Sequence, residues 1–276
     1  MKFKKLRKIY RILFPKHQSE VSVFENNLNS NHTVEKFKVT ENNEYLVELK
    51  NKSKVIVRDY THSDYDVFKQ IFNFEEYRIV VSIFQLNPIL LDNKENVFID
   101  AGANVGYTTA YFSDYAFFSK TFCVEPSITN LNILKKNISF LNNSKNIVLC
   151  ENALCGKEGI RFEIDNSFRD GKDWSTTTKV VEKGSVEGIT INEIVTKNNL
   201  KYIAFLKIDI EGAERFVFDK KNDLSFLKIT KVIAIEIHDE FNIRDSIHTI
   251  LKEHNFFLFE SGELTIGINT TFLLNS

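Results

Sequence analysis

The stretch that decides the fold of this chain is Asn96-Val97-Phe98-Ile99-Asp100-Ala101-Gly102-Ala103-Asn104-Val105-Gly106-Tyr107-Thr108-Thr109. It combines an apolar run typical of a buried strand, an acid at the end of that run, a glycine-containing turn and a segment that can begin a helix. α/β proteins build nucleotide pockets from a strand, a turn and a helix in this order. We therefore expect the rest of the chain to be arranged around a ligand site at residues 100–108.

Downstream of this stretch, short apolar runs alternate with segments of helical periodicity. The pattern predicts strands at residues 97–100, 121–125, 147–150, 202–209 and 231–237, and helices at residues 106–115, 127–141, 213–218 and 241–254. Strands that alternate with helices form a mostly parallel sheet covered on both faces. Two apolar runs near the end, 256–259 and 264–274, predict an antiparallel hairpin at one edge. The predicted fold class is α/β, with a doubly wound, Rossmann-like sheet over residues 96–276.

Residues 44–95 predict an α+β extension that packs on this main domain. Two β-branched runs, 44–49 and 54–58, are split by Lys50-Asn51-Lys52-Ser53, which is the pattern of a β-hairpin. Helical spacing follows at residues 63–71 and 75–84. We expect this section to form part of a substrate cleft.

Residues 1–43 predict a basic segment followed by a polar linker. Residues 1–16 carry seven Lys or Arg and no acid, with apolar residues at helical spacing. Two interpretations stay open: a solvated or partner-packed helix, and an amphipathic helix on an anionic membrane surface. Residues 17–43 are polar and rich in Asn, which is typical of a linker or a loosely packed arm.

Composition indicates an ordinary globular protein. The chain has 276 residues, 43% of them hydrophobic and 26% charged, with a formal net charge of -1. This charge balance gives no reason to expect nucleic acid as a partner. Cys123, Cys150 and Cys155 are too few for a disulfide framework, no apolar run is long enough for a membrane span, and no signal peptide is recognisable. We expect a cytoplasmic protein, with peripheral contact at the inner face of the membrane if residues 1–16 bind anionic lipid.

The ends of the predicted strands supply candidate ligand-binding residues, because ligands bind beyond the carboxyl ends of parallel strands. These candidates are Asp100, Gly102, Asn104, Gly106, Glu125, Asn152, Asp209, Glu211, Gly212, Glu236, His238 and Asp239. The Gly102 to Gly106 spacing differs from the dinucleotide fingerprint, which disfavours a pyrophosphate. An acid at Asp100 suits a cationic ligand group, and Glu125 is placed to accept hydrogen bonds from ribose hydroxyls. The alternative is that Glu125 only caps the helix that follows Pro126-Ser127.

Four motifs together resemble one family. They are residues 98–108, Val124-Glu125-Pro126, Asn152-Ala153-Leu154 and Leu206-Lys207-Ile208-Asp209-Ile210-Glu211-Gly212-Ala213-Glu214. They resemble the FkbM family of S-adenosylmethionine-dependent methyltransferases over roughly residues 100–254. Ser63-Asp64-Tyr65-Asp66-Val67-Phe68, followed by Glu76-Tyr77, is similar to the lead-in of that family.

The resemblance implies a Rossmann-like class I methyltransferase that uses S-adenosylmethionine. It implies O-methylation of a sugar or another hydroxyl-bearing small molecule, often in surface-glycan or natural-product pathways. With the strand-end rule, it predicts a cofactor site made of Asp100, Gly102, Ala103, Asn104, Gly106, Tyr107, Thr108, Glu125, Pro126, Asn152, Ala153 and Asp209.

Besides the cofactor site, an O-methyltransferase needs a group that accepts the proton of the acceptor hydroxyl. Alternate residues of a strand share a face, so Lys207, Asp209 and Glu211 should project together, with Glu236 and His238 beside them. We predict His238 as the general base because its ordinary pKa lies near neutral pH, with Asp209 or Glu211 as alternatives. Asp209, Glu236 and His238 can instead hold Mg²⁺ or Mn²⁺. A purely structural interpretation pairs Lys207 with Glu236 or Glu211.

Other functions stay open at this point. The acceptor can be a non-sugar hydroxyl or an amine, or the domain can be a non-catalytic cofactor-binding scaffold in a glycan-synthesis complex. A dehydrogenase is disfavoured because the dinucleotide glycine pattern is missing. The polar segment at residues 156–188 is expected to be a substrate-facing loop.

Overall fold

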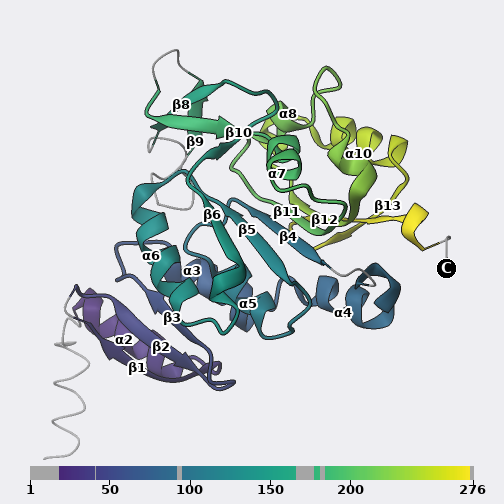
Figure 1. The fold of residues 1–276 in the computed structure, drawn as a ribbon. Helices are drawn as coiled ribbons and strands as arrows, with labels where there is room; N and C mark the ends of the chain where they lie inside the picture. Colours follow the sequence, from purple (N-terminus) through teal and green to yellow (C-terminus); the bar gives the residue numbers. More distant parts are fainter. Residues whose placement is uncertain (1–18, 41, 92–94, 166–176, 181–183, 274–276) are drawn as a thin grey trace, which may run out of the picture.

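A seven-stranded sheet forms the centre of the computed structural model, which describes residues 19–40, 42–91, 95–165, 177–180 and 184–273 (Figure 1). Its strands lie in the order β13-β14-β12-β11-β4-β5-β6. They span β4 Val97–Ala101, β5 Lys120–Val124, β6 Ile147–Cys150, β11 Ile203–Ile208, β12 Thr230–Glu236, β13 Phe256–Ser261 and β14 Leu264–Asn269. The strands from β12 to β6 are parallel, whereas β14 runs antiparallel to both β12 and β13. The predicted α/β fold with a closing hairpin is confirmed.

Helices cover both faces of the sheet (Figure 1). One group is α4 Arg78–Leu86, α5 Tyr107–Ser113 and α6 Ile128–Ser139, and the other is α7 Ile191–Lys197, α8 Glu214–Val217, α9 Phe226–Ile229 and α10 Arg244–Glu253. Successive residues of a strand point to opposite faces. Phe98 accordingly packs in the aromatic core under α4 and α5, while Ile99 packs in the aliphatic core under α7 and α10. Burial on both faces explains why the central strands are mostly apolar.

The N-terminal section contains more structure than its polar sequence indicates. It comprises α2 Glu20–Ser30, the antiparallel strands β1 Val34–Val39, β2 Tyr45–Leu49 and β3 Lys54–Val57, and α3 Asp64–Phe68, which continues as a π-helix at Lys69–Asn73. The hairpin prediction for residues 44–58 is confirmed. The polar-linker prediction is wrong for residues 20–39, because α2 buries Phe24 and Leu28, and Phe24 packs edge-on against Tyr45. Residues 1–16 lie outside the described residues.

A small second sheet branches from the carboxyl end of the central sheet. Its strands, in the order β7-β10-β8-β9, are β7 Ala153–Leu154, β8 Arg161–Asp165, β9 Thr177–Val180 and β10 Val186–Ile189. Part of the segment predicted as a substrate-facing loop is therefore paired sheet, and residues 166–176 and 181–183 lie outside the described residues. Helix α7 was not predicted, although Thr190 and Glu193 form a capping box at its start.

Short 3₁₀ helices complete the described chain at Pro88–Leu91, Ser144–Asn146, Asp239–Phe241 and Thr270–Phe272. Within the described ranges, none of the helices has the length and apolar character needed to cross a membrane.

Candidate active site

A cavity of about 270 Å³ opens at the carboxyl ends of β4, β5, β11 and β12. Strand order reverses here, because β4 has β5 on one side and β11 on the other, which is where doubly wound sheets bind ligands. The cavity wall includes eleven of the predicted site residues: Gly102, Ala103, Asn104, Tyr107, Thr108, Glu125, Pro126, Ala153, Lys207, Asp209 and Glu211. Asp100, Gly106, Asn152 and His238 do not line it.

The turn after β4 requires its glycines. Gly102 has φ +79°, and a Cβ atom there would collide with the carbonyl oxygen of Asp209. Gly106 has φ +86° at the start of α5, and a Cβ there would collide with Leu134. The missing side chain of Gly106 therefore leaves space for Leu134. The missing side chain of Gly102 lets the turn after β4 pack directly against the backbone that follows β11.

Glu125 lines the cavity together with Gly102 and Asn104, and because these residues were predicted to bind the cofactor we call this part of the lining the cofactor wall. Its Oε2 accepts a hydrogen bond from the backbone N–H of Asn104 at 2.9 Å, and its Oε1 accepts from the N–H of Ser127 at 2.9 Å and from Asn130 Nδ2 at 3.4 Å. Burial raises the pKa of Glu125 to about 7, although these hydrogen bonds favour its ionised form. Glu125 is thus fixed in position and titrates near neutral pH.

Lys207 links the two sides of the cavity. Its Nζ donates to the carbonyl oxygen of Gly102 at 2.7 Å and lies 3.4 Å from both Asp100 Oδ1 and Asp209 Oδ2. Although burial alone would lower the pKa of Lys207, the Asp209 and Asp100 carboxylates raise it overall. Its partners differ from the predicted Glu236 or Glu211, because the side chain points across the sheet toward β4.

Asp100 lies beneath the turn and away from the cavity. It is fully buried, and its Oδ2 accepts a hydrogen bond from Thr109 Oγ1 at 2.7 Å. The prediction that Asp100 touches a cationic ligand group is not supported by this position, because Lys207 is its charged neighbour. Asp209, which lies on the wall beside Gly102, is the acid that can face such a group.

Part of the cavity lining is acidic, and we call this part the acidic wall. It contains Asp209, Glu211 and Glu236 from the strand ends, together with Glu76 and Glu263. Repulsion by Asp209, together with burial, raises the pKa of Glu236 to about 9. Burial, followed by repulsion from Asp209, raises the pKa of Glu76 to about 7. Because their negative charges repel one another, the carboxyl groups of this wall do not all ionise near neutral pH. Such a wall favours cations and hydrogen-bond donors as ligands.

His238 sits behind the acidic wall and is only 4% exposed. Its Nδ1 lies 3.0 Å from Oε1 of the buried Glu214, and its Nε2 lies 3.3 Å from Glu211 Oε2. Burial alone would lower the pKa of His238, but the Glu211 and Glu214 carboxylates raise it to about 11. A protonated ring outside the cavity cannot accept a substrate proton near neutral pH. The prediction of His238 as general base is thus at odds with its surroundings.

Three side chains near this ring have the geometry of a metal-binding group. One ligand atom each from Asp209, Glu211 and His238 lies within 4.8 Å of the other two. Glu236, predicted as a ligand, is not a member of this group, although its Oε1 lies 3.8 Å from His238 Nε2. Glu211 is the acid found there instead: the chain turns at this residue, with φ +52°, shortly after the end of β11, and its Oε2 lies 3.3 Å from His238 Nε2.

Several cavity residues were not predicted. Val67, Gln70, Ile71, Glu76 and Tyr77 come from the N-terminal section, Asn130 from α6, and Glu263 from the turn between β13 and β14. Two signals in the sequence indicated the N-terminal residues: the family lead-in, which includes Val67 and Glu76-Tyr77, and the expectation that residues 44–95 form part of a substrate cleft. Asn152 was predicted and is absent from the wall because its Nδ2 donates to the carbonyl oxygen of Glu187 in β10, at 3.2 Å.

Comparison with known families identifies the domain. The model of the methyltransferase FkbM domain matches residues 100–258, which is more than half of the chain. The chain belongs to the FkbM methyltransferase family. This FkbM domain spans the sheet from β4 to β13 and contains the glycine turn, Glu125 and the acids that follow β11 and β12. Membership supports methyl transfer that depends on S-adenosylmethionine.

No curated protein sequence matches this chain significantly. Among solved structures, the precorrin-6y C5,15-methyltransferase of Geobacter metallireducens GS-15 is 12% identical, with a TM-score of 0.37 over 68% of this chain and 88% of that one. The fibrillarin pre-rRNA processing protein of Methanococcus jannaschii is 13% identical, with a TM-score of 0.38 over 84% and 96%. TrmK of M. capricolum in complex with S-adenosyl-homocysteine is 12% identical, with a TM-score of 0.34 over 67% and 66%. These similarities carry no information about the acceptor of the FkbM protein.

Proposed function

We propose that this FkbM protein is an O-methyltransferase for a hydroxyl of a sugar, either a nucleotide sugar or a surface-glycan precursor. The observation that carries the proposal is the acidic wall, formed by Glu76, Asp209, Glu211, Glu236 and Glu263 beside the cofactor wall. A carboxyl group accepts hydrogen bonds whether or not it is ionised. A polyol supplies many donors, and the family resemblance also implies a hydroxyl-bearing acceptor.

The cofactor wall fits S-adenosylmethionine. Glu125 is held where an acid accepts hydrogen bonds from ribose hydroxyls, and Gly102 leaves space for close approach of the ligand. The buried Asn104 Oδ1 has no hydrogen-bond partner among the described residues and can accept one from the ligand. Asp209 can face the cationic end of the cofactor. When bound, S-adenosylmethionine supplies a methyl group on a positively charged sulfur.

Methyl transfer to oxygen requires the chain to hold the acceptor hydroxyl in line and to remove its proton. Asp209 and Glu211 line the cavity, and we assign them as the carboxylates that orient the hydroxyl and receive the proton. His238 orients Glu211 from behind, since its Nε2 lies 3.3 Å from the Glu211 carboxylate. Lys207 positions Asp209 and the Gly102 turn together.

A transfer screen tests the acceptor. Radiolabelled S-adenosylmethionine is incubated with the protein and with a panel of nucleotide sugars, isolated surface glycans, small phenols and amines. The proposal predicts label in a carbohydrate, as a methyl ether stable to mild alkali. Label only in amines or phenols would replace the sugar with another acceptor class. Binding of the cofactor without transfer to any acceptor would favour a scaffold role.

We also propose that Asp209, Glu211 and His238 hold a divalent cation, Mg²⁺ or Mn²⁺. His238 Nε2 is buried, makes no hydrogen bond to a described residue and points at Glu211, while Nδ1 contacts the buried Glu214. A carboxylate behind the histidine is the usual support of a metal-bound ring. The ion would take the place of the proton on His238 Nε2, because histidine binds metals as the neutral ring, and it would polarise the acceptor hydroxyl and lower its pKa.

Calorimetric titration of Mn²⁺ into chelator-treated protein tests this second proposal. Saturable binding that is lost in Glu211→Gln and kept in Glu260→Gln, an acid outside the cavity, would support it. Absence of saturable binding, together with full turnover after chelator treatment, would rule the ion out.

A further inference from the structure

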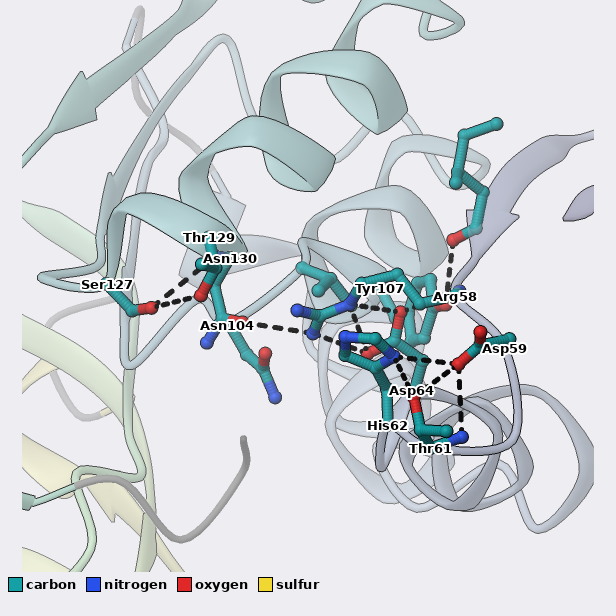
Figure 2. A network of polar contacts seen from close by, with 12 residues as sticks. Arg58, Asp59, Thr61, His62, Asp64, Asn104, Tyr107, Ser127, Thr129 and Asn130 are labelled. Carbon is teal, nitrogen blue, oxygen red and sulfur yellow. Dashed lines mark hydrogen bonds and ion pairs between the residues drawn. The ribbon is translucent and has the colours of Figure 1, made fainter. Parts of the chain in front are cut away.

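Arg58 is a buried arginine that lies outside the FkbM domain. It follows β3 and is 6% exposed. Its Nη2 donates to Oδ1 of the buried Asp64 at 2.6 Å, and its Nε donates to the two oxygens of the same carboxylate at 3.0 and 2.9 Å. The backbone N–H of Arg58 also donates to Asp64, at 2.9 Å. Figure 2 shows this arginine between Asp64 and Asn130. The charge of Arg58 is therefore matched and its guanidinium plane is fixed.

The same guanidinium reaches the cofactor wall through one amide. Arg58 Nη2 donates to Asn130 Oδ1 at 3.0 Å, and Asn130 Nδ2 donates to Glu125 Oε1 at 3.4 Å (Figure 2 shows the first of these contacts). An amide carries its acceptor and its donor on opposite sides. Because Arg58 occupies the acceptor, the donor of Asn130 must face Glu125. A flipped amide would instead turn its oxygen toward the Glu125 carboxylate.

Geometry restricts this task to arginine. The planar fork donates to Asp64 and to Asn130 from fixed positions, while the ammonium of a lysine is a compact charge on a flexible stem. Lysine at this position can keep an ion pair with Asp64, but it cannot hold both partners in the same plane. Replacement by lysine should thus keep the ion pair with Asp64, which stabilises the fold, and remove the contact that orients Asn130.

The elements that carry Arg58 and Asp64 also form part of the cavity. Asp64 begins α3, and Val67, Gln70 and Ile71 of α3 and the following π-helix line the same cavity as Glu125. On the other side, the backbone of Ile56 in β3 accepts a hydrogen bond from Tyr107 OH at 2.8 Å. The N-terminal section and the FkbM domain therefore share one buried polar network at the cofactor wall.

We propose that Arg58 is a positioning residue for cofactor binding, which acts through Asn130 on the ribose-binding carboxylate Glu125. The inference rests on the proposed function to the extent that Glu125 is taken to bind ribose. It makes the N-terminal section a part of the cofactor site, although the family match begins only at residue 100.

Calorimetry with two ligands tests the proposal: S-adenosylhomocysteine and its 2′,3′-dideoxy analogue, which lacks the hydroxyls that Glu125 would bind. In Arg58→Lys we expect the affinity for S-adenosylhomocysteine to fall about tenfold and the affinity for the analogue to stay within about twofold. Asn130→Asp removes the donor and should show the same ligand dependence. Lys136→Gln is the matched control, because it breaks another link between the hairpin and α6, the ion pair with Glu44, without touching Asn130. It should bind both ligands normally.

Two results would overturn the proposal. One is normal affinity of Arg58→Lys and Asn130→Asp for S-adenosylhomocysteine. The other is an equal loss for both ligands, which would indicate a general disturbance of the fold. The Glu125→Ala variant distinguishes failure of the cofactor assignment from failure of the role of Arg58. If Glu125→Ala also binds S-adenosylhomocysteine normally, the cofactor assignment fails; if only this variant loses affinity, the role of Arg58 fails.

Discussion

The acids on the two walls of the cavity differ in their neighbours: one wall supplies hydrogen-bond donors to its carboxylate, whereas the other brings several carboxyl groups together. Glu125 on the cofactor wall has hydrogen bonds from the chain on both carboxylate oxygens. On the acidic wall, Asp209 is the main cause of the raised pKa of Glu236, and burial is the main cause of the raised pKa of Glu76. Under the proposed function, the first arrangement holds one hydrogen-bond acceptor in place for a neutral ribose. The second concentrates groups that exchange protons or bind cations, and their crowding costs stability without a ligand.

From this difference we expect cofactor binding to depend on one wall and methyl transfer on the other. Substitutions on the cofactor wall should change affinity for the methyl donor, and substitutions on the acidic wall should change turnover. Asp209 is the residue nearest to both, because it touches Lys207 and the Gly102 turn as well as the acids.

The largest effect is expected for Asp209→Asn. Loss of a carboxylate that receives the hydroxyl proton should lower kcat about 1000-fold, within the range for general acid–base groups. The affinity for S-adenosylhomocysteine should fall less than about tenfold, because Glu125 is unchanged. Single-turnover transfer of labelled methyl measures the first quantity and calorimetry the second. A kcat within about tenfold of the unmodified protein would contradict the assignment.

Glu125→Ala should show the opposite pattern. Two charge-assisted hydrogen bonds to ribose are lost, so the affinity for S-adenosylhomocysteine should fall about 100-fold. At saturating methyl donor, kcat should recover to within a few-fold. A variant with unchanged affinity would remove the cofactor wall as defined by Glu125.

The cofactor wall was largely predictable because its signals are local. The strand at residues 97–100, the Gly102 turn and Glu125 all follow from short stretches whose geometry is set by neighbours in sequence. The closing hairpin was predictable for the same reason. Asn152 was placed wrongly because its neighbour is β10, whose pairing with β7 no pattern near Asn152 indicates.

The acidic wall was predicted only in part because it joins distant segments. Glu76 and Glu263 come from elements before and after the sheet, so their approach to Asp209 depends on tertiary packing. The charge of His238 depends on the buried Glu214, which lies on another element. Residue types alone indicated a base, whereas the neighbours make the ring a cation.

Binding of S-adenosylhomocysteine should depend on pH through the cofactor-wall acid Glu125. Ribose hydroxyls favour the ionised form of Glu125, so ligand binding lowers its pKa from about 7 and releases a proton. The affinity for S-adenosylhomocysteine should therefore be constant above about pH 8, fall by up to about tenfold per unit as the pH drops below about 7, and level off below the lowered pKa of Glu125 in the complex. Titrations in buffers of different ionisation enthalpy measure the released proton. In Glu125→Gln the release near pH 7 should disappear; its persistence would assign the proton to another group.

The smallest effect is expected for Tyr107→Phe. The hydroxyl of Tyr107 donates to the carbonyl oxygen of Ile56, which ties the cofactor wall to the N-terminal section. Loss of this buried hydrogen bond should lower the free energy of unfolding by about 1 kcal/mol, as measured by urea denaturation. An unchanged free energy of unfolding would show that this contact does not hold the two sections together.

One measurement tests the separation of the two walls most directly: titration of S-adenosylhomocysteine into Glu125→Ala and Glu211→Gln, side by side and at about pH 8, where Glu125 is ionised. The account predicts about 100-fold weaker binding for Glu125→Ala and a change below about threefold for Glu211→Gln. Equal affinities, or a larger loss for the Glu211 variant, would contradict the division of the cavity into a cofactor wall and an acidic wall.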